Sequence, residues 1–360
     1  MQRKKNILVC PLDWGLGHAT RMVPIINALE KQGANAILAA DNRPLDFLKQ
    51  YYPNNTILKL EGYSPTYPIN GSMAWALIKS APSMIKKTKK AKIDLNKIIN
   101  EYNIDAIISD NRYELSSKLI PSVFITHQLN IQTSGLQTLA KPIIDLKLNS
   151  YIDNFDEVWI PDNSEKDNLS GILSKSQKFS NKSFHIGLLS RFSSLRGITN
   201  KNSIDLMIIL SGPEPQRTIL EEKLIKQASK TKLKTVVLLG KPEESESKEL
   251  DNIMLIPHAD DINFASLLAS AKYVICRPGY STLMDLAILG TKAILIPTPG
   301  QTEQEYLASK LKKDKIAFSQ NQKEFNLLKA IQSQDEYRGF SQKNESDILN
   351  NRIHNLLNNC

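Results

Sequence analysis

The chain has 360 residues, a hydrophobic content of 41% and a net charge of +9 at pH 7. This length is typical of two domains of ordinary size, each with enough apolar residues to bury a core. The apolar runs are too short to cross a membrane or to form a signal peptide, and the three cysteines are too scattered for a disulfide framework or a metal site. We therefore expect a cytoplasmic protein without a bound metal.

The first part of the chain, 1–163, alternates short apolar stretches with helical ones. Buried strands that alternate with helices are typical of a parallel sheet covered on both faces. The sequence thus predicts an α/β, Rossmann-like N-terminal domain with a helix at 19–33. Its strands are expected at 6–12, 34–41, 104–110, 121–127 and 155–162.

The same pattern restarts after a polar segment, 164–203, which predicts a linker region. Residues 204–335 predict a second Rossmann-like domain, and 336–360 predict a final amphipathic helix. Ligands of such sheets bind beyond the carboxyl ends of the strands, so we expect the functional residues in the loops that follow them. The strands of the second domain are expected at 204–212, 233–240, 252–258, 271–279 and 291–299, with a helix at 216–230.

The loop CPLDWGLGHATR follows the first strand. Its Gly15 and Gly17 imitate an incomplete dinucleotide fingerprint, and Asp41 ends the second strand, where a dinucleotide fold keeps its ribose acid. The glycines either permit a tight turn or bring a ligand against the helix N-terminus. His18 lies in the first helical turn, where the helix dipole lowers its pKa and favours a neutral general base. Asp13 is the alternative base.

The loop LSGPEPQRT follows the first strand of the second domain. Gly212 allows the turn, and helix-start amides together with Arg217 are suited to a diphosphate. The competing interpretation is a proline-stiffened turn with a surface arginine.

Two later loops carry further polar groups. In CRPGYSTLMD, Ser281 and Thr282 are natural helix caps, and the Asp285 carboxylate can accept two hydrogen bonds from a ribose diol or simply stabilise the helix dipole. In PGQTEQE, Gln304 and Glu305 offer donors and acceptors suited to a hydroxyl-rich ligand.

Residues 73–92 place large apolar side chains beside five lysines between Lys86 and Lys92. An apolar stretch next to a lysine cluster fits an anionic membrane surface. The alternative is a solvated face on a core helix. The sequence has no zinc finger, RNA-recognition signature or aromatic-basic repeat, so nucleic acid is not an expected partner.

The stretch VICRPGYSTLMDLAILGTKAILIPTPGQTEQEYLASKL resembles the C-terminal domain of family 28 glycosyltransferases, the MurG-like group. GLGHATR resembles the glycine-rich loop of that family, THQLN resembles its His-Glu-Gln-Asn stretch, and PHADDINF resembles its base-binding loop. The family pattern falls on Cys276, Arg277, Gly279, Ser281, Thr282, Asp285, Gly290, Pro297, Gln304 and Glu305.

The resemblance implies a GT-B fold, in which two Rossmann-like domains face each other across a cleft and the final helix returns to the N-terminal domain. It also implies an inverting, metal-independent transfer of a hexose or N-acetylhexosamine, with a UDP-sugar as co-substrate and no cofactor. The implied donor residues are Ser211, Gly212, Arg217, His258, Arg277, Gly279, Ser281, Thr282, Asp285, Gln304 and Glu305. The implied acceptor residues are Trp14, Gly15, Gly17, His127 and Asn130.

Three loops depart from the peptidoglycan enzyme of this group: the first loop lacks its doubled glycines, HQLN replaces HEQN, and GPEPQR replaces a Ser-Gln-Gly loop. These departures predict a different acceptor, a lipid or lipid-linked glycan. Residues 73–92 alone predict a peripheral place on the inner face of the cell membrane. Three alternatives remain open: a nicotinamide-dinucleotide-binding redox or regulatory protein that uses residues 13–20 and Asp41, a nucleotide-binding module without turnover, and a nucleotide-sugar epimerase.

Overall fold

The structure, a computed structural model, describes residues 3–62, 73–132, 137–164, 168–195, 203–241, 244–341 and 346–360. The chain forms two compact units: Met1–Arg191 together with Asn344–Cys360, and Phe192–Lys343. The division falls inside the expected linker, 164–203, because this segment supplies the last strand of the first sheet, β7 (Ser183–His185). The end of the second unit includes Tyr337, which packs in its core, so the final helix starts later than expected.

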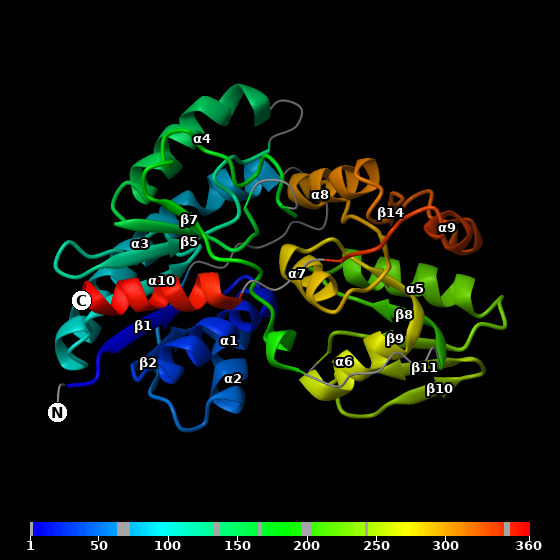
Figure 1. Ribbon diagram of the computed structural model, residues 1–360. Helices are drawn as coiled ribbons and strands as arrows, with labels where there is room; N and C mark the ends of the chain where they lie inside the picture. Colours follow the sequence, from blue (N-terminus) through cyan, green and yellow to red (C-terminus); the bar gives the residue numbers. More distant parts are fainter. Residues whose placement is uncertain are drawn as a thin grey trace. The chain divides into compact units, whose positions relative to one another are not determined.

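The first unit is built on a seven-stranded sheet in the order β3-β2-β1-β4-β5-β6-β7, and every pair of neighbours is parallel. The five expected strands are confirmed, and β3 and β7 are additional. The strands are β1 (Asn6–Cys10), β2 (Asn35–Ala40), β3 (Ile57–Lys59), β4 (Ala106–Asp110), β5 (Ser122–Ile125), β6 (Glu157–Ile160) and β7; the helices are α1 (Leu16–Lys31), α2 (Asn42–Tyr51), α3 (Met73–Glu101), α4 (Gln137–Ile152) and α10 (Ser346–Asn358) (Figure 1).

Helices cover this sheet because alternate strand residues point to opposite faces. Leu8 and Cys10 pack with Leu95 and Ile99 of α3 on one face, while α1 contacts β1 and β2. The final helix, α10, packs on α1. Its Arg352 is held by Glu157 at the start of β6, with Nε 2.9 Å from Oε2. The expected return of the chain end to the N-terminal domain is thus confirmed.

The second unit contains a sheet in the order β10-β11-β9-β8-β12-β13-β14, in which only the edge pair β10–β11 is antiparallel. All five expected strands are present. The strands are β8 (Ile204–Ile209), β9 (Thr235–Leu238), β10 (Lys248–Leu250), β11 (Ile253–Ile256), β12 (Ala271–Cys276), β13 (Ala293–Leu295) and β14 (Phe318–Ser319); the helices are α5 (Gln216–Ala228), α6 (Asp261–Ser270), α7 (Tyr280–Ile288), α8 (Thr302–Lys313) and α9 (Leu327–Gln334), preceded by a short 3-10 turn at Arg191–Ser194.

The core of the second unit joins the central strand to two helices. Leu206 and Ile208 of β8 pack in one apolar cluster with Leu220 and Leu224 of α5 and with α9. The helix α6 contacts β8 and β12. The two parallel sheets with their covering helices confirm the expected pair of Rossmann-like domains.

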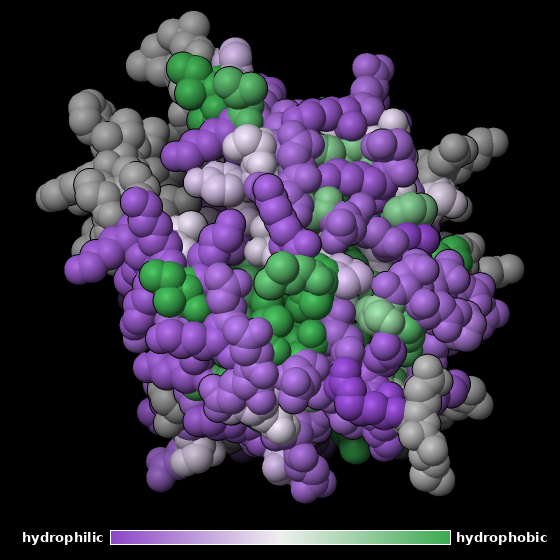
Figure 2. Space-filling view, turned by 90° about the vertical axis from the view of Figure 1, so that its left-hand side faces the viewer, coloured by the Kyte–Doolittle hydropathy of each residue, from purple (hydrophilic) through white to green (hydrophobic). Residues whose placement is uncertain are grey.

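The face shown in Figure 2 is largely hydrophilic, and its apolar side chains gather in separate patches. Within the described part of the chain, no helix has the length and apolar character needed to span a bilayer.

Candidate active site

The first unit brings two polar loops together at the centre of its sheet. β1 lies between β2 and β4, and the chain proceeds outward from this point in both directions. At such a switch point the loops after the two central strands diverge and leave a crevice at the carboxyl ends of the strands. The loop after β1 leads into α1, and β4 ends at Asp110.

A histidine and an aspartate meet at this point. His18, in the first turn of α1, places Nδ1 2.9 Å from Oδ2 of Asp110. The His18 side chain is 21% exposed, whereas the Asp110 side chain is fully buried. Because an ionised carboxylate only accepts hydrogen bonds, His18 carries its proton on Nδ1 and leaves Nε2 with a free lone pair.

Arg21 completes this cluster from the same face of α1. Its Nε lies 2.9 Å from Asp110 Oδ2, and its Nη2 donates to Asp110 Oδ1. Its Nη1 is 3.5 Å from Nδ1 of His127, a buried residue on the loop after β5. The expected acceptor residue His127 therefore belongs to this buried network.

The electrostatics keep the His18 imidazole neutral next to an ionised Asp110 carboxylate. Burial is the main cause that lowers the pKa of His18 below its ordinary value; Asp110 opposes it, and Arg21 and His127 add to it. Burial alone would raise the pKa of Asp110, but Arg21 and His18 outweigh it and hold that pKa below its ordinary value. The cluster thus contains an uncharged imidazole and an ionised carboxylate at neutral pH.

Asp13, the alternative base, lies in a more enclosed place. It is 7% exposed, its Oδ1 accepts a hydrogen bond from the Asp41 amide at 3.1 Å, and its Oδ2 has no partner among the described residues. Oδ2 lies so close to Gly62 that a Cβ there would come within 1.9 Å of it. Burial raises the pKa of Asp13 to about 6. Asp13 Oδ2 is thus buried against Gly62, whereas the His18 side chain is 21% exposed.

The remaining expected acceptor residues surround the start of α1 or lie further along the chain. Trp14 is 46% exposed, and Gly15 adopts φ = 149° at the helix N-cap, a conformation that favours glycine. Gly17 follows in the first turn. Asn130 lies after β5, where its backbone amide donates to the Leu173 carbonyl at 2.8 Å.

The second unit assembles its candidate site at its own switch point, between β8 and β12. Arg277, directly after β12, is 1% exposed. Its Nη1 donates to the carbonyls of Ile296 and Pro297 at 3.1 and 3.0 Å. Its Nη2 donates to the Gln216 carbonyl at 3.0 Å and to Oε1 of Gln322 at 2.5 Å. Arg277 thereby connects the loops after β12, β13 and β14 with the start of α5.

Arg277 has no carboxylate within ion-pairing distance among the described residues. Burial lowers its pKa to about 10, which is still well above neutral pH. It therefore remains cationic at neutral pH. Arg217 differs, because its Nη2 is paired with Glu214 and its Nη1 donates to the Leu239 carbonyl at 2.8 Å. Of the two arginines expected in the donor site, Arg277 is thus the one whose charge is not neutralised.

The loop after β13 is shaped by the two residues expected to bind the donor sugar. Gln304 Oε1 accepts from the Thr298 amide at 2.9 Å, and Glu305 Oε1 accepts from the Gly300 amide at 3.0 Å. The Thr298 hydroxyl is buried, has no partner among the described residues, and lies 3.9 Å from where a Cβ on Gly212 would be. The loops after β8 and β13 therefore approach each other closely.

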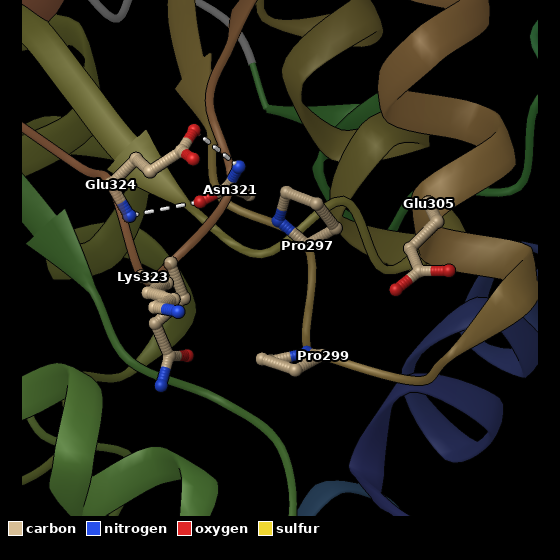
Figure 3. Close-up of a pocket in the computed structure, with 7 residues that line it drawn as sticks. Pro297, Pro299, Glu305, Asn321, Lys323 and Glu324 are labelled. Carbon is tan, nitrogen blue, oxygen red and sulfur yellow. Dashed lines mark hydrogen bonds between the residues drawn. The ribbon is translucent and has the colours of Figure 1, made fainter.

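A pocket of about 340 Å³ opens beside this loop (Figure 3). Pro297, Pro299 and Glu305 form one side of it, and 321–324 form the other. Asn321 and Glu324 bind each other there through two hydrogen bonds of 2.7 and 2.9 Å. Glu305 therefore has a pocket next to it that is lined by amides, carboxylates, the Lys323 side chain and proline rings.

The other expected donor residues also lie at the carboxyl edge of this sheet. Ser211 and Gly212 follow β8, and Gly279 is the N-cap of α7, whose first turns contain the half-buried residues Ser281, Thr282 and Asp285. His258 follows β11, separated from β8 by β9, and its side chain is exposed.

Two residues of the first-unit cluster, Arg21 and Asp110, were not among the expected site residues. Arg21 follows His18 by three positions, which on a helix places both on one face. Asp110 is the last residue of an expected strand. The helix spacing and the strand end are thus the signals that identify them, once β4 is known to lie beside β1.

The described residues contain no group of three or more His, Cys, Asp or Glu side chains arranged to hold a metal ion.

Comparisons with known proteins match part of the chain to a glycosyltransferase family and most of it to sugar transferases of low sequence identity. The sequence pattern of the glycosyltransferase family 28 C-terminal domain matches residues 215–356. The UDP-N-acetylglucosamine–N-acetylmuramyl-(pentapeptide) pyrophosphoryl-undecaprenol N-acetylglucosamine transferase of Haemophilus ducreyi is 24% identical over 311 residues, which are 84% of this chain and 81% of that enzyme. The enzyme of the same name from Desulforudis audaxviator is 44% identical over 69 residues, or 19% of this chain and 18% of that enzyme.

Solved structures show the same fold at low sequence identity. Acinetobacter baumannii MurG superposes on this chain with a TM-score of 0.60 at 15% identity. The superposition covers 98% of this chain and 100% of the MurG chain. Arabidopsis thaliana UGT89C1 in complex with UDP-L-rhamnose superposes with a TM-score of 0.63 at 14% identity, over 99% of this chain and 94% of that one.

Proposed function

Residues 215–356 of this MurG-like chain match the family 28 C-terminal domain. From this we propose that the protein transfers a hexose or N-acetylhexosamine from a UDP-sugar to a hydroxyl group of a lipid or lipid-linked glycan. The observation that carries the proposal is the His18–Asp110 pair at the switch point of the first sheet, in a chain whose residues 215–356 match a glycosyltransferase domain.

The reaction is a direct displacement. Nε2 of His18 takes the proton of the acceptor hydroxyl as its oxygen attacks the anomeric carbon. The bond from that carbon to the diphosphate oxygen breaks, the electron pair leaves with the nucleoside diphosphate, and the anomeric configuration inverts. Asp110 stabilises the imidazolium that forms on His18.

The second unit stabilises the leaving group without a metal ion. Arg277 supplies a buried positive charge that no carboxylate among the described residues neutralises. The backbone amides at the start of α7 add the partial positive charge of a helix N-terminus. Fixed charges of this kind stabilise the negative charge that develops on the leaving group. Asp285 binds the ribose, and Gln304 and Glu305 bind sugar hydroxyls. Added EDTA is expected to leave turnover unchanged.

The acceptor is a membrane lipid or a glycan carried by one. The Haemophilus ducreyi relative is named for a pyrophosphoryl-undecaprenol acceptor. In this chain, Lys86, Lys87 and Lys89 are exposed on α3, and Ile143 and Leu146 of α4 are more than 70% exposed. Exposed lysines and apolar side chains support a peripheral place on the anionic inner face of the cell membrane.

The dinucleotide interpretation explains only the first loop. The family match over 215–356 has no role in it. No feature of the second unit favours it.

A ligand screen tests the proposal. Isothermal titration of UDP-, GDP- and dTDP-sugars and of NAD and NADH should show binding of a UDP-sugar in preference to the others. Extracted membrane lipids with the best radiolabelled donor should then yield a labelled lipid product, and His18→Ala provides the matched inactive control. Binding of NADH without binding of any nucleotide sugar would contradict the proposal.

A further inference from the structure

Arg21 is the most enclosed charged group of the first-unit cluster that has no role in the reaction described above. It follows His18 by one helical turn, and its side chain is 1% exposed. Its guanidinium reaches the same carboxylate that binds His18.

The two nitrogens of Arg21 fix the plane of this carboxylate. Asp110 Oδ2 accepts from both His18 Nδ1 and Arg21 Nε at 2.9 Å, while Oδ1 accepts from Arg21 Nη2. Paired contacts of this kind restrict geometry more than a single hydrogen bond does. Rotation of the carboxylate away from His18 would break both contacts with Arg21, so Asp110 presents Oδ2 to His18 in one orientation.

Arg21 also limits the effect of the Asp110 charge on His18. The charged or titratable groups that face His18 are Asp110 on β4, Arg21 on α1 and His127 after β5. Asp110 alone would stabilise the imidazolium form, and the nearby guanidinium opposes this. With Arg21 present, the carboxylate orients the imidazole but does not hold it protonated.

We propose that Arg21 is a positioning residue of the transfer reaction, which locks Asp110 in the orientation that His18 requires and offsets its charge so that His18 stays an uncharged base at neutral pH. The proposal rests on the proposed role of His18 as the base. It assigns Arg21 an action through Asp110 and His18, with no contact to either substrate.

Two measurements on folded protein test this role. The first is an NMR titration of the His18 ring without substrates, assigned by comparison with His18→Ala. The second is the pH dependence of kcat/KM for the identified donor and acceptor. Both are made on the native chain, Arg21→Gln, Arg21→Lys and Arg352→Gln. The last variant is the matched control, because Arg352 pairs with Glu157 in the same unit but away from His18.

In Arg21→Gln we expect the pKa of His18 to rise by about one unit, and the acidic limb of kcat/KM to move to higher pH by the same amount. Arg21→Lys keeps the charge but loses the paired contact, so its pKa shift is smaller while kcat falls about tenfold. Arg352→Gln should lower the melting temperature without moving either profile.

An unchanged His18 pKa in Arg21→Gln would overturn the proposal, as would the same shift in Arg352→Gln. If Arg21→Gln does not fold, Arg21→Lys decides: a native kcat in that variant overturns the positioning role. Since the NMR titration needs no turnover, it separates this proposal from the proposed function, which fails instead if His18→Ala retains full transfer.

Discussion

At the scale of single residues, the tautomer of the candidate base is set by a side chain 92 positions away. His18 lies in a glycine-rich loop that by itself fits several functions. Its contact with Asp110 fixes its tautomer and leaves Nε2 free. The chemical role therefore depends on the pair.

Removal of either member of the pair should abolish most turnover. We expect His18→Ala to lower kcat by about 10²–10⁴-fold, because general base catalysis contributes on this order. Asp110→Asn should also lower kcat, since its amide cannot stabilise the imidazolium. Steady-state kinetics with donor and acceptor give both values. Asp13→Asn is the control, and a loss in this variant equal to that in His18→Ala would favour Asp13 as the base.

The pKa of Asp13 predicts a pH-dependent stability. Burial raises this pKa from 3.8 to about 6, so the folded chain holds a proton that the unfolded chain has released between these values. Stability from this group is present below the ordinary pKa and is lost as the pH rises through about 6. From about pH 4 to pH 7, the free energy of unfolding of Asp13→Asn should gain about 1–3 kcal/mol relative to the native chain. Urea unfolding at both pH values measures this difference, and a constant difference would contradict it.

Asp285 should recognise the ribose of the donor. A carboxylate that accepts two hydrogen bonds from a diol loses both in Asp285→Ala, so UDP affinity should fall about 10–100-fold. Calorimetry with UDP and with its 2′,3′-dideoxy analogue makes the test specific. The analogue lacks the diol and should bind the native chain and the variant alike. Equal losses for both ligands would place Asp285 elsewhere in the site.

At the scale of elements, the sequence predicts strands where apolar runs are long enough. The five central strands of each sheet follow from such runs. In contrast, β3, β7, β10 and β14 have two or three residues each and show no usable periodicity. The loops that carry Gly212 and Arg277 were predicted because they follow long strands.

The partners of these residues could not be predicted in the same way. The pairing of His18 with Asp110 needs the order of the strands, and the contacts of Arg277 join three separate loops to α5. Only the sheet topology brings such distant parts of the chain together. The burial of Asp13 also depends on Gly62, which gave no signal of its own.

The long helix α3 provides a test of membrane attachment. Lys86, Lys87, Lys89 and Lys90 are described, and all four are exposed, while the following Ala91 is buried. This agrees equally with a solvated face and with a lipid-binding one; the apolar side chains of 73–85 lie outside the described residues.

Charge reversal separates these two interpretations. Substitution of the four lysines by Glu should release the protein from vesicles that contain anionic lipid, because each lysine near such a surface contributes about 1 kcal/mol. Sedimentation with vesicles measures the bound fraction. A control variant with Lys226, Lys230, Lys232 and Lys234 changed to Glu has the same net charge. These lysines are exposed in the second unit. Equal release in both variants would indicate a non-specific charge effect.

At the scale of the whole molecule, each unit has a hydrophobic core made of its own residues. We therefore expect two separate unfolding transitions. UDP should raise the melting temperature of the second unit, since a ligand that binds the native state stabilises that state. Arg352→Ala should lower the free energy of unfolding of the first unit by about 1–3 kcal/mol, because Glu157 would lose a partly buried partner. The transition temperature of that unit should fall accordingly. Differential scanning calorimetry resolves the two effects. A single transition that responds to both changes would show that the units unfold together.

The return of α10 to the first unit has a consequence for the order of folding. Seen along the chain, the second unit is an insertion between Arg191 and Asn344 within the first. On the ribosome, the inserted unit can complete its sheet while the first still lacks the helix that covers α1. Near the chain ends, the Lys5 ammonium then reaches the Cys360 carbonyl at 2.6 Å. The unit that is begun first is therefore completed only after the second unit, once α10 has been synthesised.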